Sequence, residues 1–261
     1  MHTLQYDGTF EGWLCAVFEV YERRLTDVTI VEAAKGITNL FGTGVIIPTD
    51  ETKARRVWQG LCKKISVNAA KQIYRSFLSE EQGREDTLLN YARYALASKQ
   101  SIEYDYAHSS VRYVIDTDKK IRREKHRMEA FVRFALTGDG IYYATISPDF
   151  NVLPLIRSHF EKRYADQRWL IYDTHRKYGI YYDLDKTWPV TIEPAAQQSE
   201  QTDDQNKPLS IFTPDETQYQ DLWHHYFQKV NIEARKNLKL HLRHMPTRYW
   251  KYLPEKRPNT P

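Results

Sequence analysis

The segment from Arg243 to Tyr252 alternates basic and aromatic side chains, a combination that suits contact with nucleic acid. Its cations could neutralise phosphates, and its flat rings could stack on unpaired bases. A second basic stretch lies in the helical pattern of residues 119–134. We predict that the two stretches form one DNA-facing surface. In it Tyr249 or Trp250 stacks on a base, and the phosphate contacts come from Arg122, Arg123, Arg127, Lys236, Lys239, Arg243, Arg248 and Lys251.

A structural interpretation of the same C-terminal segment stays open. Leu238, Leu242 and Trp250 have the spacing of one apolar helix face, which could pack on the core while the cations remain in water. The two interpretations can hold for different residues of the segment.

Histidines near the C-terminus are candidate metal ligands. Four of them lie within 21 positions, namely His224, His225, His241 and His244. Adjacent side chains on a helix point about 100° apart, so His224 and His225 do not easily reach one ion. The chain also has no zinc-peptidase, zinc-deaminase, P-loop or dinucleotide-binding motif. We therefore predict no metal and no cofactor.

A predicted hairpin carries the best group of potential acid–base side chains: Asp173, Asp183, Asp185, Tyr172, Tyr181 and Tyr182. Nothing in the sequence pairs them. Carboxylates at turns and edge strands more commonly keep a sheet edge soluble, and this is the simpler interpretation.

The apolar pattern changes its period along the chain. Helical spacing dominates the first 134 residues, where short strands are expected at 4–6 and, from β-branched runs, at 28–31 and 45–47. Thr9 or Asp7 and Thr49 or Asp50 are expected to cap helices there, and Cys15 and Cys62 to lie in the core. Strands follow at 141–146, 169–172 and 178–182, with a helix near 155–160 between them. We predict an α+β fold, in which a mainly helical first half and C-terminal helices surround a small, mostly antiparallel sheet over residues 140–192.

We predict one domain over residues 1–261. Residues 194–210 hold few apolar side chains and are read as a flexible linker or insertion. A further helix is expected at 219–230, where Tyr219, Leu222 and Trp223 begin an apolar stripe.

Composition excludes several classes of protein. With 41% hydrophobic residues the 261-residue chain can bury a core, so it is not wholly disordered. No run approaches the roughly 18 apolar residues of a membrane span, and the start lacks a leader pattern, so we expect a cytoplasmic protein with no membrane partner. Two cysteines cannot form a disulfide framework, a four-cysteine zinc site or an iron–sulfur cluster unaided. The net charge of +4 is not by itself evidence for a polyanion partner.

Three segments, residues 6–23, 126–134 and 237–250, resemble a bacterial family of unknown function described as a probable DNA metabolism protein. The last segment reads Asn-Leu-Lys-Leu-His-Leu-Arg-His-Met-Pro-Thr-Arg-Tyr-Trp. The resemblance spans nearly the whole chain, and it implies a link to a radical-SAM protein of DNA modification or repair. A similar domain occurs joined to uracil-DNA-glycosylase-like domains. The family has no established catalytic residues to carry over.

The leading hypothesis is an accessory protein that binds single-stranded or lesion-bearing DNA for a radical-SAM partner enzyme. Radical chemistry would belong to the partner, because Cys15 and Cys62 are too few to hold its cluster. One alternative is a stand-alone enzyme acting on nucleic acid or nucleotides with the groups near the hairpin. A second is a protein-interaction adaptor whose aromatic surface meets its partner without touching DNA.

Overall fold

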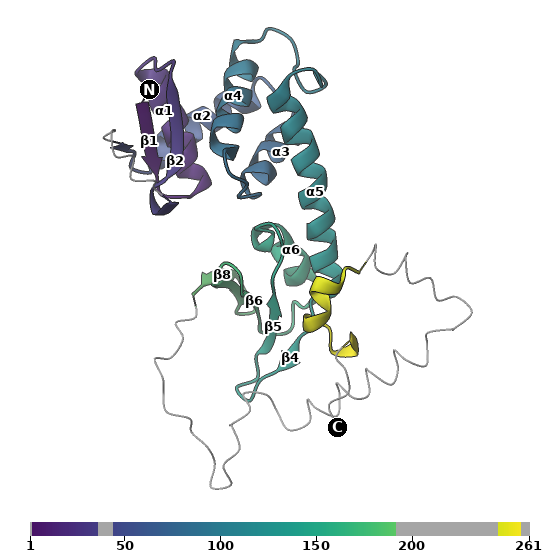
Figure 1. Cartoon of the computed structure of the whole chain (residues 1–261). Helices are drawn as coiled ribbons and strands as arrows, with labels where there is room; N and C mark the ends of the chain where they lie inside the picture. The colour runs from purple at the N-terminus through teal and green to yellow at the C-terminus, as the bar shows by residue number, and fades with distance from the viewer. Residues whose placement is uncertain (1, 36–43, 192–244, 257–261) are drawn as a thin grey trace, which may run out of the picture. The chain divides into compact units, whose positions relative to one another are not determined.

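The computed structural model describes residues 2–35, 44–191 and 245–256 (Figure 1). The chain divides into two compact units, residues 1–122 and 123–261, which are taken in turn below. The single domain over the whole chain stays a prediction. The expected linker at 194–210 and the expected helix at 219–230 lie outside the described residues.

Unit 1 contains a small parallel sheet. Strand β1 (His2–Tyr6) lies between β2 (Val28–Glu32) and β3 (Val45–Ile46) and is parallel to both. Helix α1 (Phe10–Glu22) connects β1 to β2, which is the usual way to join two parallel strands. All three strands were predicted, β2 and β3 from their β-branched runs, whereas their assembly into a sheet of their own was not. A short 3-10 turn, η1 (Ala33–Lys35), follows β2.

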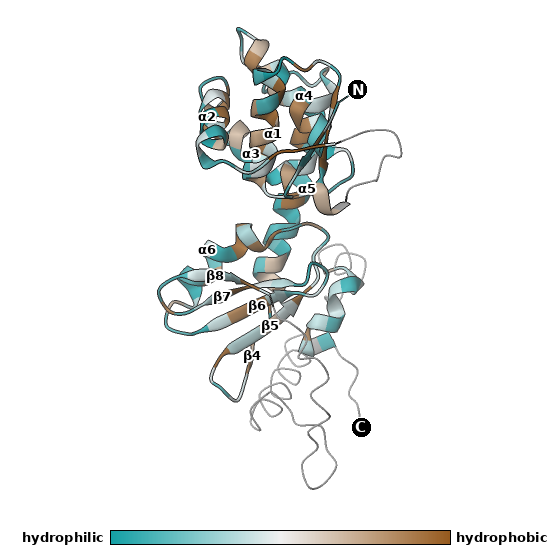
Figure 2. Ribbon diagram, turned by 90° about the vertical axis from the view of Figure 1, so that its left-hand side faces the viewer, coloured by the Kyte–Doolittle hydropathy of each residue, from teal (hydrophilic) through white to brown (hydrophobic). Residues whose placement is uncertain are grey.

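Three further helices pack in unit 1, namely α2 (Glu51–Cys62), α3 (Val67–Phe77) and α4 (Arg84–Ala97). The expected capping residues begin α1 and α2. Thr9 Oγ1 accepts the Gly12 amide at 2.9 Å at the start of α1, and Asp50 accepts the Thr52 amide at 2.7 Å at the start of α2. Figure 2 shows hydrophobic residues, in brown, along α1 and α4.

The two cysteines differ in burial. Cys15 is buried in α1 as predicted, but Cys62 is exposed, so its expected place in the core is wrong. Cys62 is the last residue of α2, and the apolar stripe that it continues is buried only as far as Leu61 and resumes at Ile65. The spacing of apolar residues along a helix does not show where the neighbouring elements stop covering its face.

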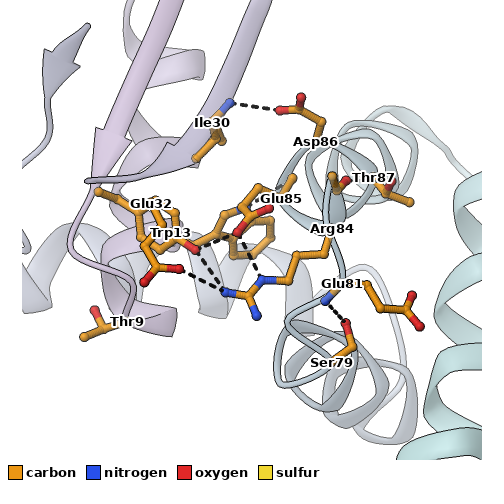
Figure 3. Close-up of polar contacts among 12 residues, drawn as sticks. Thr9, Trp13, Ile30, Glu32, Ser79, Glu81, Arg84, Glu85, Asp86 and Thr87 are labelled. Atoms are coloured by element: carbon orange, nitrogen blue, oxygen red, sulfur yellow. Dashed lines mark hydrogen bonds and ion pairs between the residues drawn. The ribbon is translucent and has the colours of Figure 1, made fainter. Parts of the chain in front are cut away.

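A buried arginine joins α4 to the strands of unit 1 (Figure 3). Arg84 Nε donates to Glu85 Oε1 at 3.0 Å, and its Nη2 lies 3.4 Å from the Tyr6 hydroxyl. The guanidinium also lies over the ring of Phe77, 4.4 Å from its centroid. Asp86 accepts the amide of Ile30 in β2 at 2.9 Å. Because a buried cation needs partners, these contacts fix the start of α4 against the sheet.

Helix α5 (Ser109–Phe131) supplies its first part to unit 1 and its last part to unit 2. It begins ten residues before the expected segment 119–134, because Val111 and Val114 extend its buried face toward the N-terminus. The predicted inward residues Ile121, Met128 and Val132 are all buried. The charged residues between them leave this apolar stripe narrow.

Unit 2 is built on a five-stranded sheet in the order β4 (Ala135–Leu136), β5 (Tyr142–Ile146), β6 (Trp169–Asp173), β7 (Tyr178–Tyr182) and β8 (Thr187–Val190). Of the pairings among the described residues, β5 with β6 is parallel and the others are antiparallel. The expected hairpin is β6–β7, and the expected helix is α6 (Leu153–Arg163), which connects β5 to β6. Trp169 and Phe160 pack with ring centroids 6.0 Å apart in the core. The predicted α+β class is therefore confirmed.

Two 3-10 helices, η3 (Thr247–Tyr252) and η4 (Pro254–Lys256), form the described C-terminal part of unit 2. Leu253 and Tyr249 are buried there. The described helices of the chain include none long and apolar enough to cross a membrane.

Candidate nucleic-acid interface

The parallel pair β5–β6 brings two polar loops to the same edge of the sheet. Parallel strands end on the same side, so Ser147, Pro148 and Asp149 after β5 lie beside the turn that starts at Asp173. The C-terminal η3 reaches this edge as well, since the Tyr252 hydroxyl lies 3.2 Å from Thr174 Oγ1. Segments far apart in the sequence therefore meet at one polar surface.

Glu124 of α5 is a buried carboxylate that contacts two segments of this surface, the loop after β5 and η3. Its side chain is 2% exposed, and its oxygens accept hydrogen bonds from the Tyr249 hydroxyl at 2.6 and 2.7 Å and from the Asp149 amide at 3.0 Å. Arg127 and Arg248 lie 3.6 and 3.4 Å from the same carboxylate. A buried carboxylate is costly without such partners, so Glu124 holds η3 and the β5–α6 loop together.

Tyr249 is a part of this buried network. It is 1% exposed, and its ring packs on Phe131 with centroids 5.5 Å apart. Burial and the Glu124 carboxylate raise the pKa of its hydroxyl, so it stays a hydrogen-bond donor at neutral pH. The ring has almost no free face, and the expected stacking of a base on Tyr249 does not fit this conformation.

Arg248 is anchored at one end and open at the other. Its Nη2 donates to Tyr249 Oη and lies 2.6 Å from Asp149 Oδ2 and 3.4 Å from Glu124 Oε2. The guanidinium lies over the Tyr249 ring, 4.6 Å from its centroid, and the side chain remains 44% exposed. In the described part of the chain Nε and Nη1 have no recorded partner. Two nitrogens of a fixed guanidinium, with three N–H donors between them, are therefore available to an oxyanion.

The other predicted cations differ in how far they are free. Arg122 is exposed and paired with Asp118 at 3.2 Å, Arg123 is exposed, and Arg127 is 20% exposed beside Glu124. Lys251 is exposed, with Nζ 4.8 Å from the ring centroid of Tyr252. Trp250 is half-buried, and its indole N–H donates to the Met245 carbonyl at 3.1 Å. Lys236, Lys239 and Arg243 lie outside the described residues.

The acid–base groups expected near the hairpin are occupied by the turns themselves. Asp173 is fully buried, accepts the amides of His175 at 2.9 Å and Arg176 at 3.2 Å, and pairs with Arg176 Nη1 at 2.9 Å. It caps the turn from inside rather than keeping an edge soluble. Asp183 accepts the amides of Asp185 and Lys186 and the Trp188 indole N–H, at 2.7 to 2.9 Å.

Of the remaining hairpin groups, Tyr182 and Asp185 line a second cleft of about 340 Å³, whereas Tyr172 and Tyr181 do not line it. Tyr182 is buried, and its hydroxyl donates to the Leu184 carbonyl at 2.9 Å. Tyr172 and Tyr181 are half-buried, and Asp185 is exposed.

Sequence reasoning did not single out Glu124, Asp149 or Arg176. Arg176 donates to the carbonyls of Pro148 and Asp149 at 3.1 Å and so ties the two strand-end loops together. The spacing strand, helix, strand over residues 142–173 was the usable signal, because it favours a parallel pair whose ends meet. Helical periodicity could have identified Glu124, because it stands three residues after Ile121 and four before Met128, on the predicted inward face of the helix.

Metal ligands do not cluster in the part of the chain that the structure describes: no group of three His, Cys, Asp or Glu side chains there could hold an ion. The four C-terminal histidines considered from the sequence lie outside those residues.

Comparison with known proteins identifies a family and a distant structural similarity. No curated protein matches the sequence. The chain is similar to a solved pGpG-specific phosphodiesterase, PggH from Vibrio cholerae, at 10% identity and a TM-score of 0.33, over 88% of this chain and 99% of the other. That score is too low to indicate a shared fold. Residues 82–255 match the model of a domain of unknown function, and since this is more than half of the chain, the protein belongs to the DUF4130 family.

Proposed function

We propose that the chain binds nucleic acid through the exposed cations of unit 2 and serves as an accessory protein in DNA modification or repair. The proposal rests on the contacts that the Arg248 guanidinium makes. Its Nη2 is held by Asp149, Glu124 and Tyr249, while Nε and Nη1 keep their donors for a ligand. A guanidinium fixed in this way loses little side-chain entropy when it binds a phosphate.

Lys251 extends the same surface. It lies one 3-10 turn after Arg248 in η3, and its ammonium group is exposed above the Tyr252 ring. Ammonium and guanidinium groups bind phosphates with charge-assisted hydrogen bonds, and each contact releases counterions from the nucleic acid. Phosphate contacts of this kind give affinity and salt dependence without sequence preference.

The contacts that the buried carboxylates already make favour an accessory role over a stand-alone enzyme. Asp173 and Glu124 each already accept hydrogen bonds from amides or hydroxyls and pair with arginines. A general base must instead be able to reach a proton of the substrate. These two groups therefore stabilise the surface and are poor candidates for chemistry.

A radical-SAM enzyme is the proposed partner, and the support for it is the sequence resemblance together with the cysteine count. An iron–sulfur cluster is held by cysteine thiolates, and this chain has only Cys15, which is buried, and Cys62. The chemistry would therefore take place on the partner while this chain holds the DNA. A mixture of the two purified proteins should elute together in size-exclusion chromatography, and separate elution with and without DNA contradicts the partnership.

The test of nucleic-acid binding is a fluorescence-anisotropy titration with single-stranded, duplex and lesion-bearing 20-mers at several salt concentrations. Lys251→Gln should lower the magnitude of the slope of log K against log salt by about 0.7–0.9. Lys162→Gln, which removes the same charge from exposed α6, is the matched control and should leave the slope unchanged. A parent protein that binds none of the probes at low salt contradicts the proposal. DNA-independent association with the partner would then favour the adaptor alternative.

A further inference from the structure

A cleft of about 610 Å³ opens in unit 1 beside α1, α2 and α3. Its volume lies within the range of roughly 300–1,000 Å³ that is usual for small-molecule sites. The rings of Phe10, Trp58 and Tyr74 line it, together with four charged side chains. All of these residues precede residue 82, where the match to the family model begins, so the family assigns no role to them.

The aromatic wall of the cleft is held in place by packing. Phe10 meets Trp58 and Tyr74 edge to face, with ring centroids 5.5 and 5.2 Å apart. The Phe77 ring packs on Phe10 with ring centroids 5.3 Å apart, and the Arg84 guanidinium lies over the Phe77 ring. Phe10, Trp58 and Tyr74 are each only half-buried. A flat ligand would therefore meet aromatic surface that needs little rearrangement.

The charges around the cleft select the kind of ligand. Glu51 and Arg55 form a pair at 3.9 Å one turn apart on α2. Lys71 and Glu11 are exposed, and the described residues provide no recorded partner for either. With two cations and two carboxylates, the lining does not favour a purely anionic ligand such as free phosphate or an acidic peptide. It suits a ring that carries both an anionic group for Lys71 and hydrogen-bond donors for Glu11.

We propose that this cleft binds one unpaired nucleobase of single-stranded nucleic acid, with the adjoining phosphate on Lys71. This inference rests on the proposed function and adds a base-binding site to its phosphate-binding surface. Bases stack on aromatic side chains regardless of their identity. Cytosine and adenine present amino groups that a carboxylate accepts, whereas unpaired thymine presents only an N3–H between two carbonyl oxygens that repel a carboxylate, so Glu11 favours amino-bearing bases.

The test is a fluorescence titration of the full chain with tetradeoxycytidylate. The chain has six tryptophans, so the signal of Trp58 is assigned with Trp58→Phe. The parent should show quenching that Trp58→Phe loses, and Trp58→Ala should bind about 5- to 150-fold more weakly, as expected for one lost stacking contact. Lys71→Gln should weaken binding severalfold, while Lys63→Gln, the matched control at the exposed end of α2, should not. Tetradeoxythymidylate should bind more weakly than the cytidylate, and Glu11→Gln should reduce the difference.

Several results would overturn the base-binding site without touching the function of unit 2. They are the same quenching in Trp58→Phe, equal quenching by a tetranucleotide without bases, or affinity unchanged in Lys71→Gln. Quenching by a phenylalanine-containing peptide but not by the oligonucleotide would assign the cleft to a protein partner. If a 20-mer still binds with a slope that depends on Arg248, the proposed function stands and only this inference fails. If the 20-mer does not bind at all, both fail.

Discussion

The Tyr249 hydroxyl donates to both oxygens of the Glu124 carboxylate, at 2.6 and 2.7 Å, and so joins residues that lie 125 positions apart in the sequence. Glu124 comes from α5 and Tyr249 from η3. The contact fixes the C-terminal segment on unit 2 and thereby places Arg248 and Lys251, the two cations on which the proposed function depends.

Replacement of Tyr249 by Phe should destabilise unit 2 measurably. The change removes a buried hydrogen bond to a charged group while keeping the ring that packs on Phe131, so we expect a loss of about 1.5–3 kcal/mol in the free energy of unfolding. Urea denaturation measures it. Tyr252→Phe is the control, because the half-buried Tyr252 hydroxyl bonds Thr174, Ser147 and Lys251 rather than a buried carboxylate. Equal stability of the parent and Tyr249→Phe would mean that Glu124 does not need this partner.

Asp173 should be structural, and its loss should be costly because it leaves a buried cation. Arg176 is 8% exposed at its side chain, and Asp173 is its carboxylate partner at 2.9 Å. We expect Asp173→Ala to lower the free energy of unfolding by about 3–5 kcal/mol. The double variant Asp173→Ala, Arg176→Met should lose less than the sum of the two single variants, since it removes both charges. Additive losses would show that the two side chains do not depend on each other.

The contribution of Asp183 to the free energy of unfolding should be lost in a window of acidic pH. The amide of Lys186, the indole N–H of Trp188 and the amide of Asp185 lower its pKa from 3.8 to about 2. A lowered pKa in the folded state means that the contribution is complete above pH 3.8 and is lost as the pH falls through 2. A carbon-detected NMR titration should find that low pKa, and Trp188→Phe should move it back toward 3.8. A value near 3.8 in the parent contradicts the turn contacts.

The two thiols should react at very different rates. Cys62 is exposed and Cys15 is buried, so native protein should titrate with one equivalent of a thiol reagent and unfolded protein with two. Burial of part of the Cys62 side chain raises its pKa, so the reaction should quicken only as the solution becomes alkaline. Cys62→Ser should remove the fast equivalent. Two fast equivalents in native protein would show that α1 opens to solvent.

The sequence allowed β5, α6 and the β6–β7 hairpin of unit 2 to be predicted, because their signals are local, whereas β4 and β8 were not predicted. The β6–β7 hairpin follows from β-branched and aromatic runs on either side of Thr174–Lys177, and α6 follows from its apolar spacing. The parallel pairing of β5 with β6 was not predicted. Pairing depends on the path of the connection, and the helix between the two strands was read only as an element and not as a crossover.

The candidate site was predicted only in part, because burial depends on distant partners. Tyr249 and Trp250 are neighbours with the same composition around them, yet only Tyr249 is fully buried, since its hydroxyl meets Glu124. The roles of Asp149 and Arg176 likewise depend on two loops that are brought together by the sheet. Residue type indicated cations able to bind phosphate, and the fold determines which of them are already paired.

The most direct test of the account compares Arg248→Gln with Asp149→Asn in titrations of a single-stranded 20-mer over a range of salt concentrations, with melting temperatures recorded for both. Arg248→Gln should weaken binding and lower the magnitude of the salt slope by about 0.7–0.9, because one phosphate contact is lost. Asp149→Asn should instead tighten binding, because it removes a carboxylate 2.6 Å from Arg248 and leaves the guanidinium in place. If both variants keep the affinity and slope of the parent, or if both weaken binding only in step with a lower melting temperature, Arg248 is not a phosphate-binding residue.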